Sequence, residues 1–503
     1  MSFSVSSSAP SSVRVRFAPS PTGFLHIGGL RTALYNYLFA KRHGGSFILR
    51  IEDTDQARFV EGAEEDIVRS LAWCGIEVDE SPLHGGEAGP YRQSERKKRY
   101  MEAAMQLINA DVAYYAFDTA EEIETMRERL KASGNPSPSY DSITRQSMKN
   151  SLTLPSEEVQ KRLEAGDPYV IRLKVPRRES VQFTDIIRGV VTFETKGLDD
   201  QVLMKSDGMP TYHLANVVDD HDMGVTHVIR GEEWLSSAPK HILLYNYFGW
   251  EPPTMAHLPL IMSPSGGKLS KRKAEQEGIP VNTRDYIDGN YEPEALVNFL
   301  AYLGWSPGDD SEIHSMDELI DLFSLEKVSK AGAVFNYKKL MWYNEHYLRE
   351  QSDDIIVQRL LDLPAAKTLS GVTQEALTAC MPLLKERITR IDEFFEMGAF
   401  FFEDPTSYDE KGMAKVGDSA SAMIHALHQA LEQHPSDELD AEAYKSWLQD
   451  TADAQGVGLG KVMLPTRLAI SGAGFGPDLT PSLAFLGKKT VLRRLQTAMN
   501  HWA

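Results

Sequence analysis

The sequence predicts an α/β domain that is interrupted by an inserted α+β segment and followed by an all-α C-terminal region. Three observations support this fold class. A strand, a turn, a helix and a second strand follow one another over residues 13–55, the pattern changes over 111–208, and helical patterns dominate after residue 282. Strands that alternate with helices favour a parallel sheet, and such sheets bind ligands at the carboxyl ends of their strands.

The first strand is predicted at VRVRF (13–17), where β-branched and polar residues alternate. APSPTG follows it, and two prolines and a glycine predict a loop. From Gly29 apolar residues recur at helical spacing until Gly44 and Gly45 end the helix. FILRIEDTD then predicts a second strand that runs into an acidic turn.

The inserted segment is predicted from charged helical stretches, the loop SGNPSPSYDS (133–142) and short strand patterns at VIRLKV and VTFET. THVIRG and HILLYNYFGW then resume the alternation of strand and helix. The later sequence is mainly helical, with an acidic stretch before a Gly-rich segment.

The composition is that of an average folded chain, with 42% hydrophobic and 25% charged residues. Only Cys74 and Cys380 occur, too few for a disulfide framework, so we expect a reducing cytoplasm. No stretch approaches the ~18 apolar residues of a membrane helix, and the Ser-rich start lacks the features of a signal peptide. We therefore expect no membrane association and a short disordered N-terminal tail.

The charge distribution predicts local rather than general anion binding. A net charge of −19 argues against a surface that attracts nucleic acid everywhere. Residues 1–51 nevertheless contain no Asp or Glu, and 92–99 and 268–273 are basic clusters. Any one cluster could face an anionic substrate or form a solvated surface. The basic residues of the first segment are Arg14, Arg16, Arg31, Lys41, Arg42 and Arg50.

Two motifs carry the chemistry. RFAPSPTGFLHIGG (16–29) places small residues and His26 where a helix begins, so the backbone can approach a phosphate. GGKLSKRK (266–273) joins flexible glycines to closely spaced lysines, which suits a mobile loop that neutralises charge on a polyphosphate. Each motif alone is weak evidence. The chain lacks G-x-x-x-x-G-K-[ST], and no G-x-G-x-x-G follows the first strand.

Taken together, HIGG (26–29) and KLSKR (268–272) resemble the HIGH and KMSKS motifs of class I aminoacyl-tRNA synthetases. RFAPSPTGFLHIGGLRTALYNYLFA, RIEDTD, TYHLANVVDDHDMGVTHVIRGEEW and KVSKAGAVFNYKKLMWYNEHYLR are similar to bacterial glutamyl-tRNA synthetases, as is GKVMLPTRLAISGAGFGPDL. Gly29 replaces the second His of HIGH, as is usual in that family. AYYAFDT and SPSYDSITR lack the cysteines that hold zinc in some members, so we predict no structural zinc.

The resemblance implies a Rossmann-like catalytic domain with an inserted domain and helical anticodon-binding domains. It also implies that ATP, with Mg²⁺, activates L-glutamate to glutamyl-adenylate, which is transferred to the 2′-hydroxyl of the terminal adenosine of tRNA-Glu. The expected ranges are a tail at 1–12, the catalytic domain at 13–110 and 209–263, an acceptor-stem-binding insertion at 111–208, a stem-contact domain with the KLSKR loop at 264–350, and anticodon-binding domains at 351–503.

The resemblance also implies roles for individual residues. An anionic substrate with one ammonium group needs arginine forks, one carboxylate and a few neutral donors. Arg16, rather than Arg14, is expected to distinguish glutamate from glutamine. The expected catalytic residues are His26, Lys268 and Lys271. The expected ATP-binding residues are Pro19, Ser20, Thr22, Gly23, His26, Gly28, Gly29, Lys268, Ser270 and Lys271. The expected glutamate-binding residues are Arg16, Ala18, Ser20, Glu52, Tyr212, Asn216, Arg230, Glu233 and Trp234.

Structural alternatives exist for several of these positions. Glu52, Asp53 and Asp55 could cap a turn, and Trp234 could be a core residue. His213, His221 and His227 lie near Asp219 and Asp220 but lack a recognised metal-ligand spacing, so structural histidines are favoured and no metal site is predicted. The basic residues of the C-terminal region could contact tRNA or lie on a solvated helix, and they are Lys488, Lys489, Arg493 and Arg494.

Two other functions compete with this interpretation. One is a paralogue that charges a modified nucleotide on tRNA, but such relatives lack the C-terminal half that is present here. The other is a catalytically inactive RNA-binding protein, which the intact His26, Glu52, Arg230, Lys268 and Lys271 disfavour. The sequence has no sharp motif that decides whether tRNA-Gln is also charged. A monomer is expected because it is usual in the family.

Overall fold

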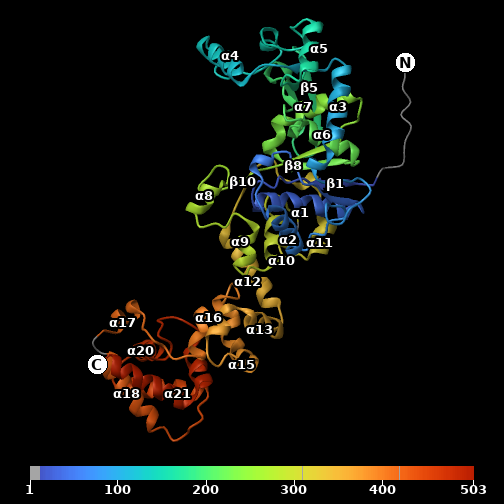
Figure 1. Ribbon diagram of the computed structural model, residues 1–503. Coiled ribbons are helices and arrows are strands. Elements are labelled where there is room, and N and C mark those ends of the chain that lie inside the picture. Colours follow the sequence, from blue (N-terminus) through green and yellow to red (C-terminus); the bar gives the residue numbers. More distant parts are fainter. Residues whose placement is uncertain (1–11, 309, 418–419, 503) are drawn as a thin grey trace. The chain divides into compact units, whose positions relative to one another are not determined.

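The computed structural model describes residues 12–308, 310–417 and 420–502. Their contacts separate two compact units (Figure 1). The first unit contains the described residues up to Gly289 together with Leu296–Tyr337, and the second contains Asn290–Ala295 and the described residues from Lys338 onward. The predicted tail at 1–12 lies outside the described residues, except for Ser12.

The predicted strand, turn, helix and strand open the first unit. β1 (Arg14–Phe17) and β2 (Ser46–Leu49) pair in parallel, and α1 (Ile27–Arg42) connects them. The apolar positions of α1 are buried, and the helix contacts both strands (Figure 1). The helix begins at Ile27, two residues before Gly29, because the His26 side chain caps its first turn.

Two larger sheets complete the first unit. One has the order β3-β4-β7 and is antiparallel. The other has the order β6-β5-β9-β8, in which β5, β9 and β8 are parallel and β6 is antiparallel to β5. Their strands are β3 (Ala113–Ala116), β4 (Val170–Leu173), β5 (Ser180–Asp185), β6 (Gly189–Glu194), β7 (Val202–Met204), β8 (His227–Gly231) and β9 (Thr254–Leu258). A separate parallel pair consists of β10 (Ile261–Met262) and β11 (Ala333–Val334).

Helices surround these sheets and supply the core of the first unit. Leu107, Leu214 and Leu244, from α3, α6 and α7, belong to one buried apolar cluster. The helices are α2 (Ala63–Trp73), α3 (Lys97–Asn109), α4 (Ala120–Ala132), α5 (Ser156–Ala165), α6 (Tyr212–Asp222), α7 (Ala238–Phe248), α8 (Lys271–Gln276), α9 (Thr283–Asp288) and α11 (Met316–Leu322), and α10 (Pro293–Ala301) has residues in both units.

The segment expected as an insertion supplies strands to two different sheets. β3, β4 and β7 form a sheet of their own, whereas the β5–β6 hairpin joins the sheet of β8 and β9 through the pair Asp185 and Met255. The hairpin therefore belongs to the same sheet as strands from the predicted second half of the α/β domain.

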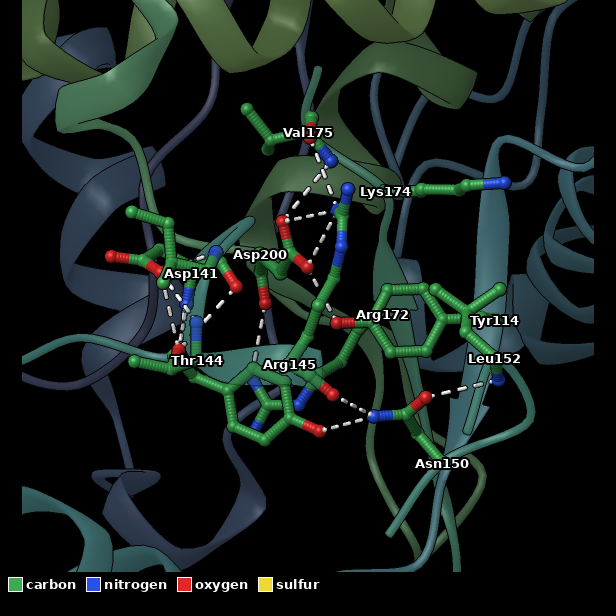
Figure 2. A network of polar contacts seen from close by, with 12 residues as sticks. Tyr114, Asp141, Thr144, Arg145, Asn150, Leu152, Arg172, Lys174, Val175 and Asp200 are labelled. Carbon is green, nitrogen blue, oxygen red and sulfur yellow. Dashed lines mark hydrogen bonds and ion pairs between the residues drawn. The ribbon is translucent and has the colours of Figure 1, made fainter. Parts of the chain in front are cut away.

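A buried polar network holds the β3-β4-β7 region together (Figure 2). Asp200 is fully buried and accepts hydrogen bonds from the Tyr114 hydroxyl (2.5 Å), from Arg145 Nη1 (3.0 Å) and from the Val175 N–H (3.1 Å). Burial raises the pKa of the Asp200 carboxyl against the opposing effect of these donors. The network thus joins β3 to the 3-10 helix Thr144–Ser147, which contains Arg145, and to the loop that contains Asp200.

In the described part of the second unit, the regular elements are helices (Figure 1). They bury two apolar clusters, one centred on α13, α15 and α16 and the other on α18 to α21. The helices are α12 (Tyr337–Glu350), α13 (Asp353–Asp362), α14 (Pro364–Thr368), α15 (Gln374–Leu384), α16 (Glu393–Gly398), α17 (Glu410–Val416), α18 (Ala420–Glu432), α19 (Ala441–Ala454), α20 (Gly460–Ser471) and α21 (Leu479–His501).

The basic residues of α21 are mostly structural. Arg494 is buried, and its Nε lies 2.8 Å from Asp404 Oδ1. Arg493 pairs with the same aspartate, and Lys488 donates to His434 O (2.8 Å). The alternatives of tRNA contact and a solvated face are therefore wrong for the buried Arg494, whereas Lys489 and Arg493 lie at exposed positions and their expected role stays a prediction. No helix among the described residues is long and apolar enough to cross a membrane.

Candidate active site

A cleft of about 1030 Å³ lies in the first unit beside the carboxyl ends of β1 and β8. Both sequence motifs contribute to its walls. The structure thus brings together every residue for which a role was predicted, although the individual roles stay predictions. These residues are Arg16, Ala18, Pro19, Ser20, Thr22, Gly23, His26, Gly28, Gly29, Glu52, Tyr212, Asn216, Arg230, Glu233, Trp234, Lys268, Ser270 and Lys271.

His26 lies at the start of α1 and is held by the helix itself. Its Nδ1 accepts a hydrogen bond from the Gly29 N–H (3.1 Å). Burial lowers the pKa of His26, with smaller contributions from neighbouring charges, so the ring is neutral near pH 7. Since Nδ1 is an acceptor, the proton resides on Nε2, which can donate to a phosphate oxygen. A Cβ on Gly28 would lie 3.1 Å from this ring, so glycine keeps the ring accessible.

The KLSKR motif forms a loop and the first turn of α8. Gly266 and Gly267 have φ values of +90° and +74°, which favour glycine. Ser270 caps α8 by accepting from the Lys273 N–H (3.4 Å). Lys268 and Lys271 are exposed, and no carboxylate of the described residues lies within ion-pair distance of either. Both ammonium groups are therefore available to an anion in the cleft.

A buried charge cluster forms one end of the cleft. Asp220 Oδ1 accepts from Arg16 Nε (3.0 Å) and from Arg50 Nη1 (2.7 Å), and Arg50 Nη2 lies 3.0 Å from Glu52 Oε1. Burial alone would raise the pKa of Asp220, but Arg16 and Arg50 together lower it. Burial raises the pKa of Glu52 against the charges of Arg50 and Arg16. The Asn216 amide is oriented with its nitrogen toward Asp220 and its oxygen toward Arg50. It then donates to Asp220 Oδ2 (3.3 Å) and accepts from Arg50 Nη2 (3.2 Å).

Arg230 reaches the cleft from β8 among aromatic and histidine side chains. Its Nη1 donates to the Tyr212 hydroxyl (3.0 Å), and its Nε donates to His257 Nε2 (3.1 Å). The rings of Tyr212 and Trp234 have centroids 4.3 Å apart, and Trp234 is 39% exposed. Trp234 is therefore part of the cleft wall, and the alternative of a core position is wrong.

The acidic turn after β2 has more than one role. Asp53 does not line the cleft, and its carboxylate accepts from the Ser94 N–H (2.8 Å), so it bonds the distant segment Gln93–Arg96 and not a backbone group of its own turn. Asp55 lines the cleft and lies 2.6 Å from Arg58 Nε. Glu52 lies in the charge cluster described above. The turn thus presents Glu52 and Asp55 to the cleft, and Asp53 connects the turn to the segment that contains Ser94.

The sequence analysis missed some residues of this site. Arg31, Arg58 and Lys205 line the cleft although no role was predicted for them. Behind Arg230, the His257 ring contacts Asp185, from a segment that was expected to belong to the insertion. Arg31 and Arg58 lie in or beside the quoted motifs, so their charge was a usable signal; the contact between His257 and Asp185 depends on strand pairing and had none.

Other candidate clusters have structural roles. His213 Nδ1 lies 3.1 Å from His241 Nε2, and the His221 ring stacks on Trp250. In the basic cluster 92–99, Arg92 pairs with Glu64, and Arg96 pairs with Asp219 and Asp222. These arginines therefore fasten helices rather than form a free positive surface.

Comparison with known proteins agrees with this geometry. The catalytic-domain model of class I tRNA synthetases for E and Q matches residues 12–342, and an anticodon-binding-domain model matches 354–499. A glutamate–tRNA ligase of Cytophaga hutchinsonii is 51% identical over 97% of this chain and 97% of the relative. A glutamate–tRNA ligase of Amoebophilus asiaticus is 49% identical over 97% of this chain and 98% of the relative.

Solved structures give the same result. The crystal structure of a glutamate tRNA ligase from Elizabethkingia meningosepticum, in complex with its amino acid, has a TM-score of 0.88 and 45% identity. It covers 98% of this chain, and this chain covers all of it (100%). The crystal structure of the glutamate-tRNA synthetase of Elizabethkingia anophelis has a TM-score of 0.86 and 46% identity. The match covers 97% of this chain and 100% of that one. The chain therefore belongs to the glutamate–tRNA ligase family of class I tRNA synthetases.

Proposed function

We propose that this chain is a glutamate–tRNA ligase, which activates L-glutamate with ATP and transfers it to tRNA-Glu. The observation that carries the proposal is the single cleft in which the HIGG motif, the KLSKR loop and two buried arginines meet. Groups suited to bind phosphate and groups suited to bind carboxylate thus line the same cleft, which supports the proposal. The match of 354–499 to an anticodon-binding domain supports a full-length synthetase over a truncated paralogue.

The reaction has two steps. An oxygen of the glutamate α-carboxylate attacks the α-phosphorus of ATP, and pyrophosphate leaves to give glutamyl-adenylate. The 2′-hydroxyl of the terminal adenosine of tRNA then attacks the acyl carbon, and AMP leaves. Neither step needs a covalent enzyme intermediate, so positioning and charge neutralisation account for most of the rate enhancement.

The phosphate end of the cleft consists of the two motifs. The neutral His26 ring would donate from Nε2 to a phosphate oxygen, beside the first N–H groups of α1. Lys268 and Lys271 would neutralise the charge that develops as pyrophosphate leaves. The residues proposed to contact ATP are Pro19, Ser20, Thr22, Gly23, Gly28, Gly29 and Ser270 together with these three, and all of them line the cleft.

The amino-acid end consists of the charge cluster and the residues around Arg230. Arg16 and Arg230 would bind carboxylates, and Glu52 would face the ammonium group. Tyr212 accepts from Arg230 through its hydroxyl oxygen, which leaves its O–H proton to donate toward the cleft. Ala18, Ser20, Asn216, Glu233 and Trp234 would complete this pocket.

Mg²⁺ would enter with ATP as part of the substrate, since it prefers phosphate oxygens and retains much of its water.

We propose that the insertion contains no zinc. Tyr114 and Arg145, from the two segments that correspond to the zinc-binding region, both contact Asp200 instead. Stoichiometric zinc in metal analysis of the purified protein would contradict this. We further propose a cytoplasmic monomer.

The decisive experiment is aminoacylation of purified tRNA-Glu and tRNA-Gln side by side with labelled glutamate and ATP. Charging of tRNA-Glu is expected, and the same measurement reveals whether tRNA-Gln is also a substrate. RNA binding without any aminoacylation would refute the proposed activity and favour the inactive RNA-binding alternative.

A further inference from the structure

Arg230 is a buried cation whose hydrogen-bond acceptors are all neutral. It is 5% exposed and donates to His257 Nε2 (3.1 Å), the Tyr212 hydroxyl (3.0 Å) and Trp234 O (3.4 Å), and its Nη1 lies 3.3 Å from His241 Nδ1. Within the described ranges, no carboxylate lies at ion-pair distance from its guanidinium. A buried charge without a counter-ion is costly, and an anionic ligand in the cleft would relieve that cost.

The neighbours of Arg230 are placed by the sheet. Arg230 in β8 and His257 in β9 are register partners on adjacent parallel strands, and β5 pairs with the other edge of β9 and ends at Asp185. The His257 Nδ1 lies 2.6 Å from Asp185 Oδ2. A chain of contacts therefore runs across three neighbouring strands, from the Asp185 carboxylate through His257 to Arg230.

Asp185 determines which nitrogen of His257 carries the proton. Its carboxylate accepts from the backbone N–H groups of Ile187 (3.0 Å), Arg188 (2.8 Å) and His257 (3.1 Å). Since a carboxylate surrounded by donors is ionised, Nδ1 of His257 must be the donor to it. Nε2 then keeps a lone pair, and this lone pair accepts from Arg230 Nε.

Direct contact with an aspartate would orient Arg230 equally well but would neutralise it. Arg16 illustrates this, because it bonds Asp220 directly. At Arg230 the imidazole separates the cation from the carboxylate, so the guanidinium is oriented while its positive charge remains available. Burial lowers the pKa of His257, and the nearby Arg230 lowers it further against the raising effect of Asp185, which keeps the ring neutral.

We propose that Asp185 and His257 are positioning residues, with His257 acting as a neutral spacer that holds Arg230 toward a carboxylate of the amino-acid substrate. The inference rests on the proposed function, because that function makes glutamate the ligand of the cleft. Neither residue contacts the substrate. Both act through Arg230, on the affinity for glutamate rather than on the binding of ATP.

Two variants of His257 each remove one of the two hydrogen bonds that its ring makes, one to Asp185 and one to Arg230. In His257→Gln the amide oxygen reaches the position of Nε2 and can accept from Arg230, whereas the contact with Asp185 is lost. In His257→Asn the shorter amide reaches the position of Nδ1, so the contact with Asp185 is kept and Arg230 loses its acceptor. A role confined to folding would depend on both bonds alike.

The measurements are KM for glutamate and for ATP, with active sites titrated by adenylate formation, and equilibrium dialysis of labelled glutamate. We expect His257→Asn to weaken glutamate binding by about tenfold or more, the value of one hydrogen bond to a charged group. His257→Gln should stay within about threefold of the unaltered enzyme, and KM for ATP should change by less than about twofold in both.

Equal weakening in both variants, or no change in either, would overturn the positioning role. Charging of tRNA-Glu by the unaltered enzyme tests the proposed function separately, because dialysis measures glutamate affinity even without turnover. If the unaltered enzyme charges tRNA-Glu but the two His257 variants bind glutamate equally well, only the positioning role is refuted. An unaltered protein that does not bind glutamate refutes both.

Discussion

At the scale of single residues, Arg16 and Arg230, the two arginines of the proposed amino-acid pocket, have different electrostatic environments. Arg16 bonds through Nε to Asp220, which Arg50 also contacts. Its two terminal nitrogens have no acceptor among the described residues, and Arg16 lines the cleft. Arg230 has only neutral acceptors. Arg16 is therefore suited to recognise the pattern of donors and acceptors on a ligand, and Arg230 supplies uncompensated charge.

Arg16 is expected to select glutamate over glutamine. The two substrates are nearly equal in size, but only a carboxylate offers two acceptors to a guanidinium, whereas an amide turns an NH2 group toward the cation. Sites with such buried polar groups can discriminate by about 10⁴-fold. In Arg16→Gln we expect the ratio of kcat/KM for glutamate over glutamine, measured with tRNA, to fall by about 100-fold or more.

Arg14→Gln is the matched control for this experiment. Arg14 lies two residues earlier in β1, does not line the cleft, and bonds Glu80 (2.7 Å) and Met223 O (2.9 Å). Its substitution should lower stability and leave the ratio unchanged. An Arg16→Gln enzyme that retains the original ratio would refute the role assigned to Arg16.

Lys271 is expected to act mainly on the transition state of activation. Its ammonium has no carboxylate partner among the residues that the structure describes, and charge develops beside it only as pyrophosphate leaves. Lys271→Ala should lower the rate of adenylate formation by roughly 100-fold, with a smaller change in ATP affinity. Arg272→Ala, at an adjacent exposed position that does not line the cleft, is the control. Loss of ATP binding at an unchanged maximal rate would contradict this role.

At the scale of elements, the β3-β4-β7 region depends on a buried polar network. Asp200 joins Tyr114 of β3 to Arg145 (Figure 2). Arg172 of β4 lies with its guanidinium carbon 3.9 Å from the centroid of the Tyr140 ring and donates to Asp200 O (2.9 Å). These contacts link β3 and β4 to segments that are far apart from them in the sequence, beside the apolar residues that the region also buries.

Tyr114→Phe should loosen this region locally. The variant removes a buried hydrogen bond to a carboxylate, which is worth about 1.5 to 3 kcal/mol. Hydrogen exchange of the β3 and β4 amides should therefore become about 10- to 100-fold faster. Tyr115→Phe is the control, because its hydroxyl contacts only Met105 Sδ (3.4 Å) among the described residues. Equal exchange in the two variants would show that Asp200 does not organise the region.

At the scale of the whole molecule, both units bury apolar clusters, and the first unit also buries many ionisable groups. The second unit buries two apolar clusters between helices. The first unit also buries charged groups and neutral histidines around its cleft. His241 is fully buried, and burial lowers its pKa well below the ordinary value. Burial, with a smaller contribution from Lys240, lowers the pKa of His213 to about 4.

These histidines are expected to make the first unit sensitive to acid. Between pH 6.5 and about 4, His213 binds a proton in the unfolded chain but not in the folded one. The unfolded state then binds more protons, so stability falls as the pH is lowered through this window, by up to about 3 kcal/mol from this group. Melting curves of His213→Gln should show a smaller fall than those of the unaltered protein.

His84→Gln, at an exposed position of the same unit, should behave like the unaltered protein and is the control. Parallel loss of stability in the His213 variant would show that this histidine does not account for the effect.

The order of the first strands, the helix between them and many of the residues that line the cleft could be predicted from the sequence. These features depend on local periodicity and on contiguous motifs, such as HIGG and KLSKR, whose residues lie close together along the chain. The helical character of the C-terminal region was predictable for the same reason. The family also followed from the motifs, and the comparisons confirmed it.

The partners of the charged residues, in contrast, became visible only in the folded structure. Arg96 and Arg494 look like parts of basic surfaces in the sequence, but they pair with Asp219 and Asp404. The chain of contacts from Asp185 to Arg230 depends on the pairing of three strands that are far apart in the sequence. The partner of a charged residue cannot be identified from the sequence, because ion pairs and hydrogen bonds depend on distances that only the folded backbone determines.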